Sequence, residues 1–187
     1  MRLILSCVLP MCLAAVVQAD PQREADPDSG LIRWRLSLSA LRLELAQRLP
    51  DQTRGFFLAR GFPAALADDY ARRCVFQTIG RNIGDSMAIT LDTRLWRIRR
   101  AGRIRPIAAK ADLLQAWSAQ GLPANAALAF RWATFPSEQT FQPGDYNWGM
   151  IGFGPKPGES FDLKLVWFEA GKRKTHWIRQ LICAEER

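Results

Sequence analysis

Apolar and polar residues alternate along several segments of the chain, and the first such segment lies at residues 32–40. This pattern is typical of a strand with one buried face. The apolar positions in it are Ile32, Trp34, Leu36, Leu38 and Ala40. The apolar residues then move from even-numbered to odd-numbered positions, at Leu41, Leu43 and Leu45. This shift requires a bulge, a turn or a change of sheet. A helix over residues 40–49 is the alternative, because these residues are good helix formers.

Later segments repeat the alternating pattern. We expect further strands at residues 74–82, from Met87 to Ile98, at 128–133 and at 161–167. The pair Ala101-Gly102 predicts a hairpin turn, with Ile104 and Ile107 on the returning strand. A turn at residues 170–172 leads into a last strand that carries Cys183.

Two segments have helical rather than alternating spacing. Residues 63–73 start with a proline that suits a first helical turn, and Leu66 and Tyr70 form an i, i+4 apolar pair. Residues 111–120 place Leu113, Leu114 and Trp117 on one face, and Gly121 followed by Pro123 ends the segment. The sequence therefore predicts two short helices.

Many short strands with few helices predict a mainly β protein. The strand, Asn82-Ile83-Gly84 turn and strand resemble patterns in immunoglobulin-like domains of exported bacterial proteins, over about 25 residues. The expected fold is a single antiparallel β-sandwich (immunoglobulin-like) domain at residues 31–187, with one or two short helices in its connections.

The first 19 residues have the pattern of a secretory signal peptide. Arg2 precedes an uncharged run from Leu3 to Val17, and small residues stand at Val17 and Ala19 before a polar segment. The apolar run has about 15 residues, whereas a membrane span needs about 20, so a permanent anchor is the less favoured alternative. We expect cleavage near Ala19, a flexible lead-in at residues 20–30, no transmembrane segment in the mature chain, and a periplasmic or secreted location.

Removal of the expected signal peptide leaves two of the four cysteines in the mature chain. Cys7 and Cys12 leave with the signal peptide, so Cys74 and Cys183 are the two that remain. Because thiols pair in an oxidising compartment, we expect a disulfide between them. No C-x-x-C spacing indicates a redox function.

The candidate catalytic and metal-binding residues are few. His176 is the single histidine, and no nucleophile motif accompanies it, so an ordinary strand contact is the favoured interpretation. Met87 and Met150 are too scattered to form a copper site with it. A carboxylate pair such as Glu138 and Asp145 needs no motif, which keeps a small secreted hydrolase as the alternative function. The sequence predicts no metal, no cofactor and no catalytic residue.

The segment 135–154 is the most unusual part of the chain, because it mixes aromatic and amide residues with Gly and Pro. We expect Asp145, Tyr146, Asn147 and Trp148 to form a contact site, since large flat side chains with hydrogen-bonding groups are typical of such sites. The alternative is a hairpin whose aromatic residues cover one end of the core.

Arginine occupies six of the twelve positions from 94 to 105. Around a hairpin turn, Arg97, Arg99 and Arg103 are candidates to hold phosphates, an anionic lipid or an acidic protein, and the alternative is a solvated hairpin tip. The formal net charge of the whole chain is +8. The sequence predicts a non-enzymatic binding or accessory domain for a protein or an anionic envelope component, with possible peripheral membrane contact and no nucleic-acid partner.

Overall fold

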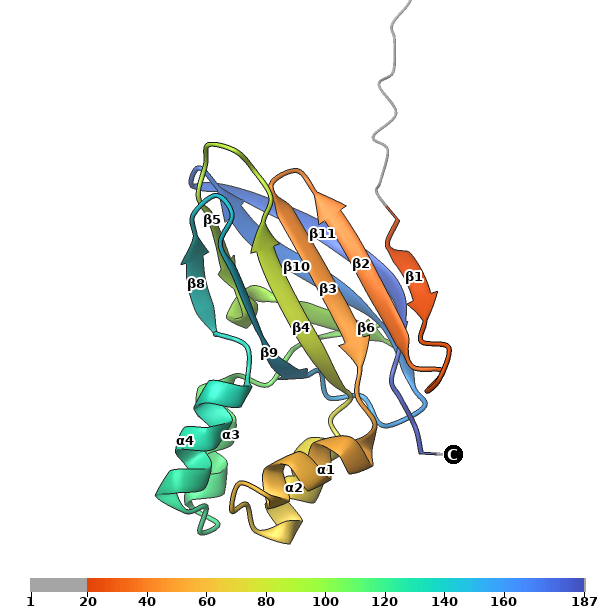
Figure 1. Ribbon diagram of the computed structural model, residues 1–187, viewed down its shortest axis with the longest axis vertical. Coiled ribbons are helices and arrows are strands. Elements are labelled where there is room, and N and C mark those ends of the chain that lie inside the picture. The colour runs from red at the N-terminus through yellow and green to blue at the C-terminus, as the bar shows by residue number, and fades with distance from the viewer. Residues whose placement is uncertain (1–19, 187) are drawn as a thin grey trace, which may run out of the picture.

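The computed structural model describes residues 20–186, and the expected signal peptide lies outside them. Within these residues the protein is mostly β, with 43% strand and 23% helix, and its strands form two antiparallel sheets that are not closed into a barrel (Figure 1). The first sheet has the spatial order β1 (Gln22–Ala25), β2 (Ile32–Leu38), β3 (Leu41–Gln47), β4 (Val75–Asn82) and β9 (Tyr146–Gly152). The second has the order β7 (Arg103–Pro106), β6 (Arg97–Arg100), β10 (Ser160–Glu169), β5 (Ile89–Asp92) and β8 (Glu138–Phe141), and β11 (Lys172–Ile182) also pairs with β10.

The parity shift after residue 40 is a tight turn. Strands β2 and β3 form a hairpin in which Leu38 lies opposite Leu41, and Ser39 has a positive φ of 48°. The turn moves the inward-facing positions from even-numbered to odd-numbered residues, so that Leu36 and Leu43 lie opposite each other and face the same core. The turn is confirmed, and the helix considered for residues 40–49 is wrong.

The strand expected from Met87 to Ile98 is broken in the middle. A 3₁₀ turn, η1 (Thr93–Leu95), separates β5 from β6, and the Asp92 carboxylate accepts a hydrogen bond of 3.0 Å from the Arg94 N–H. Strand β10 pairs with β5 near residue 168 and with β6 near residue 163, whereas β11 pairs with β10 over most of its length. The two short strands therefore follow one another along one edge of β10.

Side chains from both sheets pack into one apolar core. Phe76 of the first sheet and Leu163 of the second are fully buried in it, and Trp96 donates its indole N–H to the Val166 carbonyl at 3.1 Å. The expected disulfide is confirmed, because Cys74 and Cys183 are bonded with their Cα atoms 5.1 Å apart. It joins the residue before β4 to the residue after β11.

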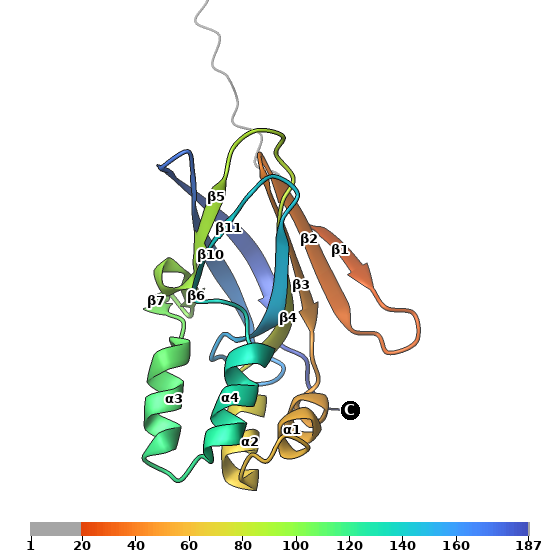
Figure 2. The same cartoon turned by 60° about the vertical axis from the view of Figure 1, so that its left-hand side comes forward.

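Four helices, rather than one or two, lie at one end of the sheets (Figures 1 and 2). They form two helical hairpins, one of α1 (Pro50–Leu58) and α2 (Ala64–Ala71), the other of α3 (Lys110–Ser118) and α4 (Ala124–Ala133). The two expected helices correspond to α2 and α3. Helix α1 was not expected; Pro50 begins it, and the Gln52 side chain accepts a hydrogen bond from the Leu49 N–H at 3.2 Å.

Helix α4 replaces the strand expected at residues 128–133. Its buried residues are Ala126, Phe130 and Ala133, which have helical spacing, whereas Leu128 and Trp132 of the alternating pattern are exposed. The segment follows Pro123 and is rich in alanine, the strongest helix former. Helix propensity and burial at i, i+4 and i+7 thus outweigh a coincidental period of two.

The two helical hairpins repeat the same construction 60 residues apart. Gly61 and Gly121 both have a positive φ, and each helix begins after the proline that follows two residues later. The side chains between the hairpins also occupy equivalent positions, in the pairs Phe57 and Trp117, Phe62 and Leu122, Leu66 and Ala126, Tyr70 and Phe130. These residues form a second apolar core, separate from the one between the sheets.

The N-terminal part of the described chain forms an edge strand. Residues 22–25, within the expected lead-in, pair with β2 although all four are exposed, so backbone pairing rather than apolar periodicity forms β1. The immunoglobulin-like topology is not confirmed: that fold sends its third strand to the second sheet, whereas β1 to β4 are successive neighbours in one sheet. None of the helices within residues 20–186 is both long and apolar enough to span a membrane.

Candidate functional site

Tyr146 and Trp148 project from β9, the strand at one edge of the five-stranded sheet. They lie opposite Arg81 and Ile79 of β4, on the sheet face that is turned away from the shared core. Each of the two residues is 56% exposed, and the Arg81 guanidinium stacks on the Tyr146 ring at 4.8 Å from its centroid. We call these four residues, Ile79, Arg81, Tyr146 and Trp148, the aromatic face.

The helices cover only one end of this sheet surface. Val75 and Met150 point to the same side as the aromatic face, but both are buried in the core of the helical hairpins. The covering therefore stops before Trp148. The alternative that the aromatic residues of segment 135–154 close the core applies to Phe135 and Phe141, which are buried, and not to Tyr146 or Trp148.

Asn147 points to the opposite side of β9 and joins the edges of the two sheets. Its amide donates to the Gln139 side-chain oxygen on β8 at 2.6 Å, and its own oxygen accepts a hydrogen bond from the Trp148 N–H at 2.7 Å. The Asn147 side chain thus provides an acceptor for a backbone N–H of this edge strand. Asn147 positions the aromatic face and does not belong to it.

Asp145 closes the turn that carries the chain from one sheet to the other. Its carboxylate accepts a hydrogen bond from the Gln142 N–H at 2.8 Å, and its carbonyl accepts one from the Asn82 N–H at 2.9 Å. Segment 135–154 is therefore not one loop, because β8 belongs to the six-stranded sheet and β9 to the five-stranded sheet. The structure brings Tyr146 and Trp148 to one surface and gives Asp145 and Asn147 structural contacts.

The arginines of the β6–β7 hairpin also fall into two groups, those with partners inside the protein and those that are exposed. Arg97 is half-buried and donates to the carbonyls of Arg94 and Trp96, both at 2.8 Å. Arg99 is bound to the Asp162 carboxylate at 2.7 Å and stacks on the Trp177 ring at 4.6 Å. These two expected binding residues have partners within the chain.

Arg103 and Arg105 are exposed on β7, and no ion pair is found for either within residues 20–186. They line a groove of about 690 Å³ between the hairpin, the start of α3 and the segment that follows β9. Ile98, Ile107 and Phe153 supply apolar walls, and Lys156 also lines the groove. Arg100 also lines the groove but pairs with Glu159.

The carboxylates considered for a hydrolase are also engaged. Glu138 pairs with Arg94, which is bound at the same time to Asp92 at 2.8 Å. Hydrogen bonding from Arg94 holds the pKa of Asp92 below its ordinary value. Glu138 is thus tied to an ion-pair cluster, and Asp145 to its own turn.

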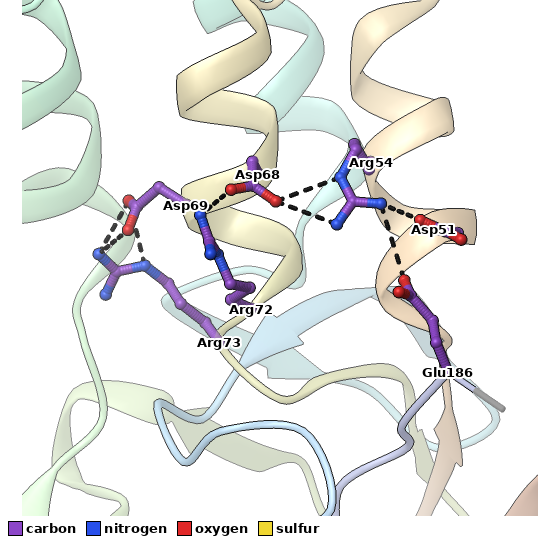
Figure 3. Close-up of polar contacts among 7 residues, drawn as sticks. All are labelled: Asp51, Arg54, Asp68, Asp69, Arg72, Arg73 and Glu186. Carbon is purple, nitrogen blue, oxygen red and sulfur yellow. Dashed lines mark hydrogen bonds and ion pairs between the residues drawn. The ribbon is translucent and has the colours of Figure 1, made fainter.

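A larger charged network belongs to the first helical hairpin (Figure 3). Arg54 of α1 bonds Asp68 of α2 at 3.0 Å, pairs with Asp51 and reaches Glu186 near the C-terminus at 3.7 Å.

Asp69 links this first helical hairpin to the other one, because its carboxylate accepts a hydrogen bond from the indole N–H of Trp117 at 2.9 Å. Arg72 and Arg73 complete the network by pairing with Asp68 and Asp69. Its contacts hold helices and the chain end together.

His176 is half-buried on β11, opposite Leu165 of β10. Burial lowers the pKa of its imidazole, and the nearby Asp20 carboxylate opposes this effect. Met150 is buried in the helical core, whereas Met87 is exposed. Across residues 20–186, no three His, Cys, Asp or Glu side chains gather in an arrangement that could hold a metal ion.

Sequence reasoning missed Arg105, Lys156 and Trp177. The spacing of Arg103 and Arg105 was a usable signal, because two residues separated by one on a strand point to the same side. Lys156 lies 50 positions beyond Pro106, where the hairpin ends, and no local pattern connects them. Trp177 alternates with the buried Ile178 on β11, which places its ring on the outer face.

Comparison of the chain with protein-family models, with curated proteins and with solved structures finds no match.

Proposed function

We propose that this protein is an exported, non-enzymatic β-sandwich that binds a partner protein through its aromatic face. The signal-like N-terminal sequence and the Cys74–Cys183 disulfide support export, because disulfides form and persist in oxidising compartments. The proposed partner presents an acidic surface, for the reasons given below.

The exposure of Tyr146 and Trp148 carries this proposal. The two rings alternate with an inward-pointing residue on one strand, so they stand side by side on a hydrogen-bonded sheet rather than on a loose loop. Aromatic side chains held rigidly lose little conformational entropy on binding, and Trp and Tyr are enriched among residues that dominate contact energies.

The charge around these rings defines the chemistry of the partner. Arg42 of β3 lies directly opposite Arg81 of β4, and both arginines are exposed on the same sheet face as the rings. Like charges placed opposite each other on neighbouring strands repel. A carboxylate from a partner between these two guanidinium groups would relieve that repulsion, which favours an acidic protein surface.

The test is affinity capture of partners from an envelope extract, followed by a binding measurement with the retained protein. Trp148→Ala is expected to weaken binding by about 1 kcal/mol or more, or roughly fivefold, because a central aromatic contact is lost. Ile104→Ala is the matched control, since Ile104 is equally exposed but lies on β7 of the other sheet.

Both variants are first compared with the wild type in thermal unfolding. A Trp148→Ala protein that melts normally and binds with unchanged affinity would contradict the proposal. Equal losses in the Trp148→Ala and Ile104→Ala proteins would also contradict it, because the effect would then not be specific to the aromatic face.

A further inference from the structure

A second surface of the protein has the composition of a ligand site, and it shares no residue with the aromatic face. We propose that the groove beside the β6–β7 hairpin binds a single-chain amphiphile with a phosphate headgroup. Its volume of about 690 Å³ lies within the range of small-molecule sites, which is roughly 300–1,000 Å³.

The walls of the groove are largely apolar. Ile98 comes from β6, Ile107 follows β7, and Phe153 follows β9, so three separate segments of the chain supply them. These three residues and Pro155 are each less than a tenth exposed, so they form the floor of the groove, and its exposed apolar surface comes from Ala101, Pro106 and Ala108. An alkyl chain over this surface would remove apolar area of both molecules from water.

The rim of the groove is cationic, and strand register explains why. Arg105 lies opposite the inward-pointing Ile98, and Arg103 lies opposite Arg100, so both arginines leave the hairpin on the side that carries Ile98. Their Cα atoms are about 7 Å apart, as for any two residues separated by one on a strand. Lys156, in the segment that follows β9, supplies a third positive charge to the groove.

The acidic residues at the groove do not cancel this charge. Glu159 forms an ion pair with Arg100. Among the described lining residues, Asp112 is then the one remaining acidic side chain, and the remaining basic side chains are Arg103, Arg105 and Lys156. Guanidinium groups bind phosphate through paired hydrogen bonds. A phosphate joined to an alkyl chain therefore matches both parts of the groove.

Other ligands match only one part. Inorganic phosphate would satisfy the rim and leave the exposed apolar surface uncovered, whereas a neutral amphiphile would cover that surface and leave the excess positive charge of the rim uncompensated. The groove should therefore bind tightly only a molecule that carries both a phosphate and an alkyl chain. Molecules that carry one of these two groups are the controls.

The experiment is calorimetric titration of the purified, disulfide-bonded protein with dodecyl phosphate below its micelle concentration. Dodecyl maltoside provides the same chain without charge, and inorganic phosphate provides the charge without a chain. We expect one dodecyl phosphate per chain, bound at least tenfold more tightly than either control. Binding of inorganic phosphate or dodecyl maltoside with equal affinity would overturn the proposal.

Two variants locate the site. Arg103→Gln combined with Arg105→Gln should weaken binding at least tenfold, and Ala108→Trp should do the same by filling the groove while keeping every charge. Arg23→Gln combined with Arg33→Gln is the charge-matched control on the other sheet, at exposed positions outside both proposed sites, and should change affinity less than twofold. Unchanged binding by a folded groove variant, or an equal loss in the control, would overturn the assignment.

The same titration separates this site from the proposed partner surface. Trp148→Ala should bind dodecyl phosphate as the wild type does, because Trp148 does not line the groove. Loss of dodecyl phosphate binding in Trp148→Ala would overturn the placement of the ligand in the groove, whatever the outcome of the partner-binding test.

Discussion

At the scale of single residues, Asn82 shows how one polar side chain can organise two connections. It is fully buried, and its amide donates to the carbonyls of Met87 at 2.8 Å and Phe141 at 3.0 Å. Its oxygen accepts the Gly84 N–H at 2.9 Å. A buried amide is stable only with such partners. Asn82 therefore fixes the turn after β4 and, through Phe141, the crossing from β8 to β9 that presents the aromatic face.

His176 makes the stability of the protein depend on pH. Burial lowers its folded pKa below the ordinary value of 6.5, so the unfolded chain binds more protons than the folded one just below that pH. The free energy of unfolding should consequently fall as the pH falls through 6.5. We expect urea denaturation of the wild type to show a larger loss between pH 7.5 and 5.5 than that of His176→Gln.

The glutamine variant is a suitable control because it keeps a polar side chain and cannot titrate in this interval. Aspartate and glutamate side chains ordinarily titrate near pH 4 and contribute similarly to both proteins. An identical pH dependence for the wild type and His176→Gln would contradict the inferred burial effect.

At the scale of elements, the alternating pattern predicted strands well where both sheet faces have a defined environment. In β10, Phe161, Leu163, Leu165 and Trp167 all point inward and are buried, as their spacing indicates. The same pattern was misleading in α4, where a second core selects residues with helical spacing. Local periodicity cannot distinguish these cases, because the deciding contacts come from α2 and α3.

The 60-residue repeat was the available signal for α1 and α4, the two helices that were not expected. Gly61 and Gly121, each followed two positions later by proline, mark equivalent turns, and α2 and α3 were already predicted on either side of them. Applying the repeat in both directions would have placed α1 before Gly61 and α4 after Gly121. The sequence carried this information as self-similarity rather than as periodicity.

Gly149 should tolerate no side chain where α4 meets β9. A Cβ atom there would lie 2.3 Å from the Phe135 nitrogen and 2.5 Å from the Thr134 carbonyl carbon, both of which are backbone atoms. We expect Gly149→Ala to lower the free energy of unfolding by about 1–3 kcal/mol or more, because the backbone must shift. Equilibrium denaturation in urea measures this change.

Gly55 provides the opposite case for the same substitution. It lies within α1, and a Cβ atom at this position would have no neighbour within 4 Å. Gly55→Ala should therefore raise stability by roughly 0.5–1 kcal/mol through its higher helix propensity. Equal effects of the two substitutions would contradict the close approach at Gly149.

At the scale of the whole molecule, the sequence predicted a β-rich protein and its disulfide but not the order of its strands. Nothing local indicates that β8 and β9 belong to different sheets, because the four residues between them could equally close a hairpin. The candidate sites follow the same division. Tyr146 and Trp148 are neighbours in sequence and were predicted together, whereas the groove combines Arg103 with Lys156 through the fold alone.

The Cys74–Cys183 bond determines what a proteolytic cut between these two residues can release. The exposed tip Ala101-Gly102, flanked by the exposed Arg100 and Arg103, lies inside the 109-residue loop that this bond closes. A single tryptic cut at the tip should leave two pieces that migrate together on a non-reducing gel and separate once dithiothreitol is added. Separation without the reductant would contradict the linkage. A nick there would sever the chain without releasing either half.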